Sequence, residues 1–261
     1  MIGIDIFSVA FCALILIYAC CSDIKKRSVT NRLWLLMIAV GIPIAFYNIL
    51  IQGMPFLIRF TYSVIFTFVF AYLFFRLRLF GGADAKCLIA LSVLIPVNPG
   101  FTFFSYQFPI NFSSFVMHDP FPFAVTTLLN ATLFSLCVPI GLFIYNLLTL
   151  RRNELKGDFG LAFIGYKLRI DALSDMVNKH TRLVHSYEEE EGDVKRIFIF
   201  GGREIDAEVV EALKEYRAQG KIGDKVWVTP ELPFILSITA GFFTALLYGN
   251  LIFNIMLALM L

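Results

Sequence analysis

The sequence contains few charged residues and no paired-cysteine motif. Asp, Glu, Lys and Arg make up 16% of its 261 residues, whereas a soluble domain carries about 25%. This scarcity of charge excludes an ordinary cytosolic enzyme, a disordered protein and a nucleic-acid-binding protein. The five cysteines lie in or beside apolar segments and form no CxxC pair, so the sequence predicts neither a zinc knuckle nor a disulfide framework. We expect these thiols to pack as small hydrophobic groups.

Long apolar segments dominate the rest of the chain, which is 58% hydrophobic and contains 29 Phe. Runs near the ~20 residues of a membrane-crossing helix indicate lipid as the main solvent. Met1–Asp5 lacks the basic region and cleavage site of a secretory signal, so we expect the first run to remain in the mature protein. The pattern predicts a polytopic α-helical membrane protein with six transmembrane helices. The apolar runs cover about residues 6–22, 33–51, 56–75, 85–97, 123–148 and 232–258.

The fourth apolar run is too short for a simple crossing. Residues 85–97 would form a helix about 20 Å long, whereas the hydrocarbon core is about 30 Å thick. Pro96, Asn98, Pro99 and Gly100 then interrupt it. Either the uncharged stretch Phe101–Ile110 completes the crossing, or the segment is a short helix shielded by its neighbours.

Lys and Arg residues fall almost entirely on one side of the predicted helices. They cluster after the first and third runs and within residues 151–230, and Arg59 alone lies on the other side. The positive-inside rule then places both termini outside the cell and residues 151–230 in the cytoplasm. The outer loop, residues 98–122, contains eight aromatic residues. It is either an aromatic belt at the membrane surface or a ligand-binding lid.

The charge distribution divides the chain into three parts. We expect a membrane domain of five helices in residues 1–150, a small cytoplasmic α+β domain in 151–230, and the last transmembrane helix in 231–261. The expected elements of the cytoplasmic domain are one or two strands in Gly157–Ile170, a polar helix over Asp171–Glu191, a strand over Val194–Phe200 stopped by Gly201–Gly202, a helix over Ala207–Ala218 capped by Asp206, and a strand over Lys225–Val228.

Two carboxylates, Asp23 and Asp84, stand out at the predicted cytoplasmic ends of the first four segments. Ionisable groups at a membrane are costly and are therefore functional candidates. Asp84 is alternatively a helix N-cap, and Asp23 is alternatively a partner for Lys25–Arg27. Two facing carboxylates share a proton, so that one activates a water while the other polarises a carbonyl, as in aspartic proteases. Gly81–Gly82, just before Asp84, would permit positive φ angles and a close substrate backbone.

The segments around these acids carry a resemblance to a known family. Phe80–Lys86 (FGGADAK) and Ser22–Arg32 (SDIKKRSVTNR) resemble the two aspartate motifs of the type IV prepilin peptidase family, within the GxGD intramembrane aspartyl proteases. The likeness covers about residues 10–97 and the segment KVWVTPELPF. Thr30 stands where the family commonly has Pro. The archaeal preflagellin peptidase branch fits best, because the chain lacks the bacterial insert with two CxxC pairs.

The resemblance implies a membrane aspartyl endopeptidase that removes the short basic leader, a class III signal peptide, from archaeal preflagellins and pilin-like precursors at the cytoplasmic face. It implies that Asp23 and Asp84 are the catalytic pair, that Gly81 and Gly82 shape the loop, and that Lys86 stabilises the loop or the substrate backbone. It implies no metal and no cofactor. We expect the two acids to lie farther apart without substrate than the ~3 Å of a proton-sharing pair.

Other interpretations remain open from the sequence. Paired membrane acids also occur in cation- or proton-coupled transporters, although these usually place them near the bilayer midplane. A noncatalytic anchor for a filament system would explain the cytoplasmic domain but not the two aspartates. The acidic run Glu188–Glu191 either attracts the basic leader or forms a solvated helix end.

Overall fold

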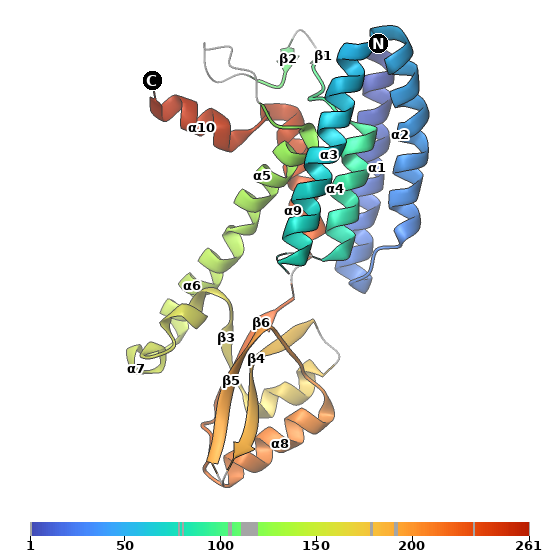
Figure 1. The fold of residues 1–261 in the computed structure, drawn as a ribbon. Helices are drawn as coiled ribbons and strands as arrows, with labels where there is room; N and C mark the ends of the chain where they lie inside the picture. The colour runs from blue at the N-terminus through green and yellow to red at the C-terminus, as the bar shows by residue number, and fades with distance from the viewer. Residues whose placement is uncertain are drawn as a thin grey trace. The chain divides into compact units, whose positions relative to one another are not determined.

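The computed structural model describes residues 2–77, 79, 81–103, 106–110, 120–177, 180–190, 193–231 and 233–260. Arg78 of the predicted basic loop and Phe80 of the glycine motif lie outside these residues. The chain divides into two compact units, one of residues 1–135 and 233–261 and one of residues 136–232. The first unit contains α1 (Ile2–Lys26), α2 (Asn31–Gln52), α3 (Met54–Arg76), α4 (Gly82–Leu94), the hairpin of β1 (Phe101–Phe103) and β2 (Tyr106–Phe108), α5 (Phe123–Ser135), α9 (Phe234–Tyr248) and α10 (Leu251–Met260) (Figure 1).

Among the described residues, four helices are long and apolar enough to cross a membrane. They are Asp5–Lys26, Asn31–Gln52, Met54–Arg76 and Phe123–Thr149. The pair α9 and α10 would make a fifth span if it is counted as one, although it is bent by 50°. The chain therefore has four to five helices suited to a membrane, and six spans are not confirmed.

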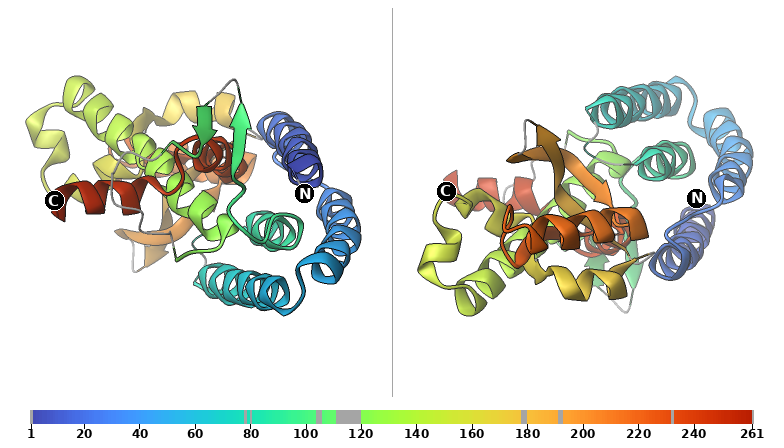
Figure 2. Two further views of the ribbon diagram at one scale, coloured as in Figure 1. Left: turned by 90° about the horizontal axis from the view of Figure 1, so that it is seen from above. Right: turned by 90° about the horizontal axis from the view of Figure 1, so that it is seen from below.

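The fourth predicted segment is a short helix enclosed by its neighbours. Helix α4 has 13 residues and contacts α1, α2, α3, α5 and α9. Viewed along the helices, α1, α2 and α3 form an arc around α4 (Figure 2). After α4, β1 and β2 pair as antiparallel strands instead of continuing the helix. Of the two possibilities left open by the sequence, the shielded short helix is correct. The choice between aromatic belt and lid for the outer loop falls largely on positions outside the described residues.

Small residues allow close helix packing in this unit. A Cβ atom on Gly41 of α2 would lie 3.0 Å from Cα of Leu94, and one on Gly241 of α9 would lie 2.4 Å from the carbonyl oxygen of Thr127 on α5. A side chain on Gly241 would therefore collide with α5, and one on Gly41 would make an unusually tight contact with α4. Such contacts are typical of helix packing in membranes, where close van der Waals packing stabilises association.

A buried asparagine compensates for the break between α9 and α10. Gly249, with a φ of 67°, caps the end of α9 and directs the chain away from the helix axis. The buried Asn130 side chain donates to the Gly249 carbonyl at 2.8 Å and accepts from the Leu251 N–H at 3.0 Å. Backbone groups released by the break thus keep hydrogen-bond partners, as an apolar environment requires.

The second unit is a small α+β structure. Its sheet has the strand order β3-β6-β4-β5, and all neighbours are antiparallel. Helix α8 and η2 pack on one face through a core that includes Leu183, Val209 and Leu213, while Val184 and Trp227 form a second core on the other face. The elements are α6 (Cys137–Thr149), α7 (Arg152–Leu155), the 3-10 helices η1 (Phe159–Phe163) and η2 (Ile170–Met176), β3 (Tyr166–Arg169), β4 (Thr181–Glu190), β5 (Asp193–Glu204), α8 (Ala207–Ala218) and β6 (Lys225–Pro230).

Several expectations for this unit are confirmed. Helix α8 begins after Asp206, whose side chain accepts a 2.7 Å hydrogen bond from the Val209 N–H, as the capping pattern predicts. Strand β6 includes the predicted Lys225–Val228. In Gly157–Ile170 the structure has one strand, β3, preceded by η1.

Two expectations are wrong. The predicted helix over Asp171–Glu191 is the short η2 followed by strand β4, because four successive buried residues, from Leu183 to Ser186, suit a strand that is covered on both faces. The predicted stop at Gly201–Gly202 is also wrong, because β5 continues through both glycines to Glu204.

The acidic run is therefore not a helix end. Glu189 pairs with Lys221, and Glu190 pairs with Lys195 across the hairpin. Both pairs lie at the surface, where ion pairs contribute little to stability. Glu191 lies outside the described residues.

Candidate active site

Asp84 lies in the first turn of α4 and is buried. Its residue is 8% exposed to solvent, and its Oδ2 accepts a hydrogen bond of 2.9 Å from the Gly81 N–H. Gly81 occupies the N-cap position and Asp84 the third helical position. The carboxylate therefore satisfies a free backbone donor at the helix start, where negative charge is favoured. Within the described part of the chain, the other oxygen, Oδ1, has no hydrogen-bond partner.

The glycines before Asp84 act differently from the expectation. Gly81 has φ −78° and ψ 165°, and neither Gly81 nor Gly82 has a positive φ, so the two glycines do not use the positive φ angles that they would permit. What Gly81 provides is room, because a Cβ atom there would lie 3.3 Å from Oδ2 of Asp84. A Cβ atom on Gly82 would lie 3.6 Å from the Phe75 ring, an ordinary contact.

Asp23 lies in the last turn of α1 and is partly exposed. The turn that follows is held by two hydrogen bonds, from the Arg27 N–H to the Asp23 carbonyl at 2.9 Å and from Ser22 Oγ to the Ser28 carbonyl at 3.0 Å. Arg27 has a φ of 50°, an uncommon conformation for a residue with a side chain. Among the described residues no ion pair joins Asp23 to Lys25, Lys26 or Arg27. The alternative in which Asp23 serves only to pair with these residues is therefore not favoured.

The two acids lie on the same side of the helical unit. Asp23 at the end of α1 and Asp84 at the start of α4 are at the same end of this unit, opposite the N-terminus (Figure 1). No hydrogen bond joins the two carboxylates in the part of the chain that the structure describes. The fold therefore brings both acids to one end of the helices without a direct hydrogen bond between them.

A further contact joins the two motif segments. Lys86, one turn of helix from the start of α4, donates a 2.9 Å hydrogen bond to Oδ1 of Asn31, the first residue of α2. Asn31 was not predicted from the sequence to be a site residue, although it belongs to the segment SDIKKRSVTNR. The sequence did offer one sign of its role, because Asn31 is a polar residue at a predicted helix start and follows Asp23 in the same segment.

Two carboxylates in this arrangement are suited to acid–base catalysis. One can accept a proton from a water molecule while the other donates one to a carbonyl oxygen. Among the described residues no cluster of three or more His, Cys, Asp or Glu has the geometry of a metal site. Cys12, Cys20 and Cys87 are buried, and Cys21 and Cys137 are exposed; all five are free thiols.

Comparisons with known proteins cover nearly the whole chain. Residues 10–144 match the model of the type IV leader peptidase family, and residues 157–251 match a model described as archaeal peptidase A24 C-terminus type II. The chain is 24% identical to a preflagellin peptidase of Methanococcus maripaludis, over 94% of this chain and 96% of that protein. It is 23% identical to one of Methanocaldococcus jannaschii, over 93% and 94%, and 26% identical to one of Methanococcus voltae, over 93% and 95%.

Proposed function

The chain belongs to the type IV leader peptidase family, and from this premise we propose that it is a membrane aspartyl endopeptidase that removes the short basic leader from preflagellins and pilin-like precursors. The substrate class is supported by the preflagellin peptidases of similar length. The mechanism is supported by one observation above the others: Asp23, at the end of α1, and Asp84, at the start of α4, lie at the same end of the helical unit.

In the proposed reaction the two carboxylates act as a pair with one shared proton. The ionised carboxylate takes a proton from a water molecule, whose oxygen attacks the carbonyl carbon of the scissile peptide. The protonated carboxyl group donates to the carbonyl oxygen. Collapse of the tetrahedral intermediate breaks the C–N bond, and the proton taken from water passes to the leaving amine. The proposed reaction uses no metal and no cofactor.

The neighbouring residues position this pair. Gly81 brings a backbone N–H to Oδ2 of Asp84 and leaves space beside it for an extended substrate. Gly82 begins the helix that carries Asp84. Lys86 holds the first turn of α4 against the start of α2 through Asn31. We assign Lys86 as a positioning residue, because its ammonium group is engaged by this contact.

We further propose that cleavage occurs at the cytoplasmic face. Lys25 and Lys26 lie with Asp23 in the last turn of α1, and Arg76 ends α3 shortly before the α4 turn that carries Asp84. Such charges favour the cytoplasmic side. Both termini would then lie outside the cell, and the domain of residues 151–230, between the membrane domain (1–150) and the last helix (231–261), would lie in the cytoplasm. The partners in this proposal are the precursor protein and the lipid bilayer.

Leader removal by membranes that contain the protein tests the proposal. We expect a purified preflagellin to shift on a gel by the mass of its leader, and Asp23→Asn and Asp84→Asn each to abolish the shift, because both roles need a carboxyl group. Asp23→Glu and Asp84→Glu should also be severely impaired, since an added methylene exceeds the ~0.5 Å that a catalytic site tolerates. Asp5→Asn, at the other end of α1, is the matched control and should cleave normally. Leader removal near the wild-type rate by Asp23→Asn or by Asp84→Asn would disprove the paired mechanism.

A further inference from the structure

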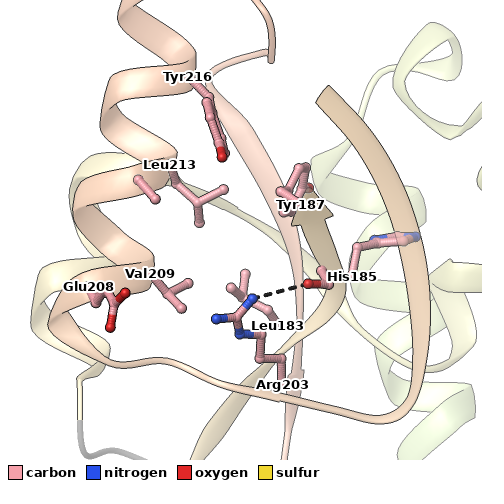
Figure 3. A pocket seen from close by; sticks show the side chains of 10 residues that line it. Leu183, His185, Tyr187, Arg203, Glu208, Val209, Leu213 and Tyr216 are labelled. Carbon is pink, nitrogen blue, oxygen red and sulfur yellow. Dashed lines mark hydrogen bonds between the residues drawn. The ribbon is translucent and has the colours of Figure 1, made fainter. Parts of the chain in front are cut away.

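The second unit contains a cavity that the proposed protease reaction does not use. It lies between the strands β4 and β5 and the helix α8, and its volume is about 180 Å³ (Figure 3). A cavity of about 150 Å³ is large enough to admit a benzene molecule, so this one has room for a small organic ligand. Its walls combine apolar side chains with a few polar groups, the usual character of a ligand site.

Arg203 supplies the positive charge of this cavity. The pairing of β4 with β5 is irregular between Leu183, opposite Arg203, and His185, opposite Phe198. This bulge redirects the strand, as bulges commonly do, and Arg203 Nη1 donates to Ser186 Oγ at 3.1 Å. Ser186 is 4% exposed, so the contact fixes the guanidinium at the cavity wall.

The guanidinium of Arg203 has no carboxylate partner among the described residues. Other arginines of the same unit have one: Arg196 pairs with Asp158 and Arg217 with Asp171. The remaining N–H groups of Arg203 are therefore available to a ligand. A guanidinium presents its donors as a planar fork that matches the two oxygens of a carboxylate.

Glu208 supplies a negative charge to the same cavity. It lies in the first turn of α8 and lines the cavity together with Arg203, but the two side chains are not within the 4.0 Å of an ion pair. Figure 3 shows them on the border of one space, with the hydroxyl of Tyr216 directed toward it. Opposite charges that border one cavity without pairing leave room for a ligand that carries both charges.

Apolar side chains complete the cavity. Leu183 of β4 and Val209 and Leu213 of α8 contribute aliphatic surface, and Tyr187 and Tyr216 contribute rings. A ligand that contacts these residues would bury an aliphatic or aromatic group of its own, at a gain of about 25 cal/mol per Å² of apolar surface removed from water.

We propose that this cavity binds a free α-amino acid with an apolar side chain, with its carboxylate on Arg203, its ammonium on Glu208 and its side chain against Val209 and Leu213. The end of a peptide chain has the same chemistry only in part. A C-terminal residue lacks the ammonium group and an N-terminal residue lacks the carboxylate. Arg203 and Glu208 are both exposed at the cavity border, so a free amino acid can engage both charges at once, whereas a chain end can engage only one.

Binding is measured on the purified full-length protein in detergent, by equilibrium dialysis with radiolabelled L-leucine and L-phenylalanine. We expect saturable binding of at least one of them below about 1 mM. N-acetyl-L-leucine, without the ammonium, and L-leucinamide, without the carboxylate, should each compete at least tenfold more weakly than L-leucine. Equal competition by either analogue, or no saturable binding of either amino acid, would overturn the proposal.

Variants locate the binding in this cavity. Arg203→Gln and Glu208→Gln should each weaken binding at least tenfold, and Ala212→Leu should weaken it by filling the cavity. Two controls carry the same changes of charge on exposed side chains outside the cavity: Arg169→Gln, and Glu211→Gln one turn along α8 from Glu208. These should bind as the wild type does. Unchanged thermal unfolding will show that the variants are folded, and equal effects of cavity and control variants would contradict the assignment. Leader removal is measured separately and is not expected to depend on this site.

Discussion

Lys86 on α4 donates a 2.9 Å hydrogen bond to the side chain of Asn31 at the start of α2, 55 residues earlier in the chain. Asp84 lies two residues before Lys86 on the same helical turn, and Asp23 lies just before the loop that leads into α2. The contact therefore joins the segments that carry the two acids. This hydrogen bond limits how far the beginning of α4 can move relative to α2.

Loss of this hydrogen bond should lower the rate of leader removal without changing its chemistry. We expect Lys86→Gln and Asn31→Ala each to reduce kcat/KM about three- to tenfold, the range of one ordinary hydrogen bond. The double variant should be no worse than the worse single variant, because both remove the same contact. Lys26→Gln, which changes a basic residue at the end of α1, is the control. Effects that simply multiply in the double variant would show that the two residues act independently.

Patterns within single helices were sufficient to predict several helices of both units. The apolar lengths of α1, α2 and α3 and the cap of α8 depend on neighbouring residues, so they could be predicted from the sequence. Strand β4 could not, because the acidic residues at its end suggested a solvated helix, while the partners that bury Leu183 and Val184 come from distant segments.

The candidate site, too, could be predicted from the sequence only in part. Asp23 and Asp84 were identifiable because a carboxylate beside a long apolar run is unusual. The Gly81 N–H bond to Asp84 and the role of Asn31 depend on three-dimensional geometry. A backbone angle cannot be inferred from glycine alone, and Gly81 illustrates this, since its φ of −78° is available to most residues.

Close packing of α9 on α5 should make Gly241 intolerant of any side chain. Gly241→Ala would place a Cβ atom 2.4 Å from the Thr127 carbonyl oxygen, so the two helices must separate. We expect a marked fall in the temperature at which the detergent-solubilised protein leaves the monodisperse peak in size-exclusion chromatography. Gly141→Ala in α6 is the control, because no atom lies within 4 Å of its added Cβ. That change should be neutral or stabilise the helix by about 0.5–1 kcal/mol. Similar losses for both variants would contradict the packing argument.

Protonation of His185 should contribute to the pH dependence of stability. Burial in β4, and to a smaller extent the positive charge of Arg196, lower the pKa of His185 from its usual 6.5, while Asp158 acts in the opposite direction. Below pH 6.5 the unfolded chain therefore binds this proton before the folded chain does. The free energy of unfolding should rise with pH between the lowered pKa and 6.5, and fall as the solution is acidified through that range.

Unfolding temperatures measured between about pH 7.5 and pH 5.5 test this contribution. His185→Gln should retain stability better on acidification than the wild type does, because the glutamine cannot be protonated. His180→Gln removes a more exposed histidine and is the control. The same loss of stability on acidification in the wild type and in His185→Gln would show that this residue makes no contribution.

Substrate binding should bring the two proposed catalytic positions closer together. Without substrate, the carboxylate of Asp84 is held by the Gly81 N–H, and no hydrogen bond joins it to Asp23 among the described residues. Two like charges repel unless a proton lies between them. Without substrate, separated carboxylates are therefore more stable than an adjacent pair. A peptide carbonyl and a water placed between them would supply the missing bridge. Closing of this kind before the chemical step is common in enzymes.

Cysteine crosslinking can measure this closure. Asp23→Cys and Asp84→Cys would be combined in a protein whose five native cysteines are replaced; it is inactive, so a bound precursor stays uncleaved. A disulfide needs Cα atoms about 4.4–6.8 Å apart, and we expect it to form faster with preflagellin present than without it. Asp23→Cys combined with Arg59→Cys, at the other end of the helices, should form none in either case. Equal rates with and without the precursor would indicate a pair that is already assembled before substrate binds.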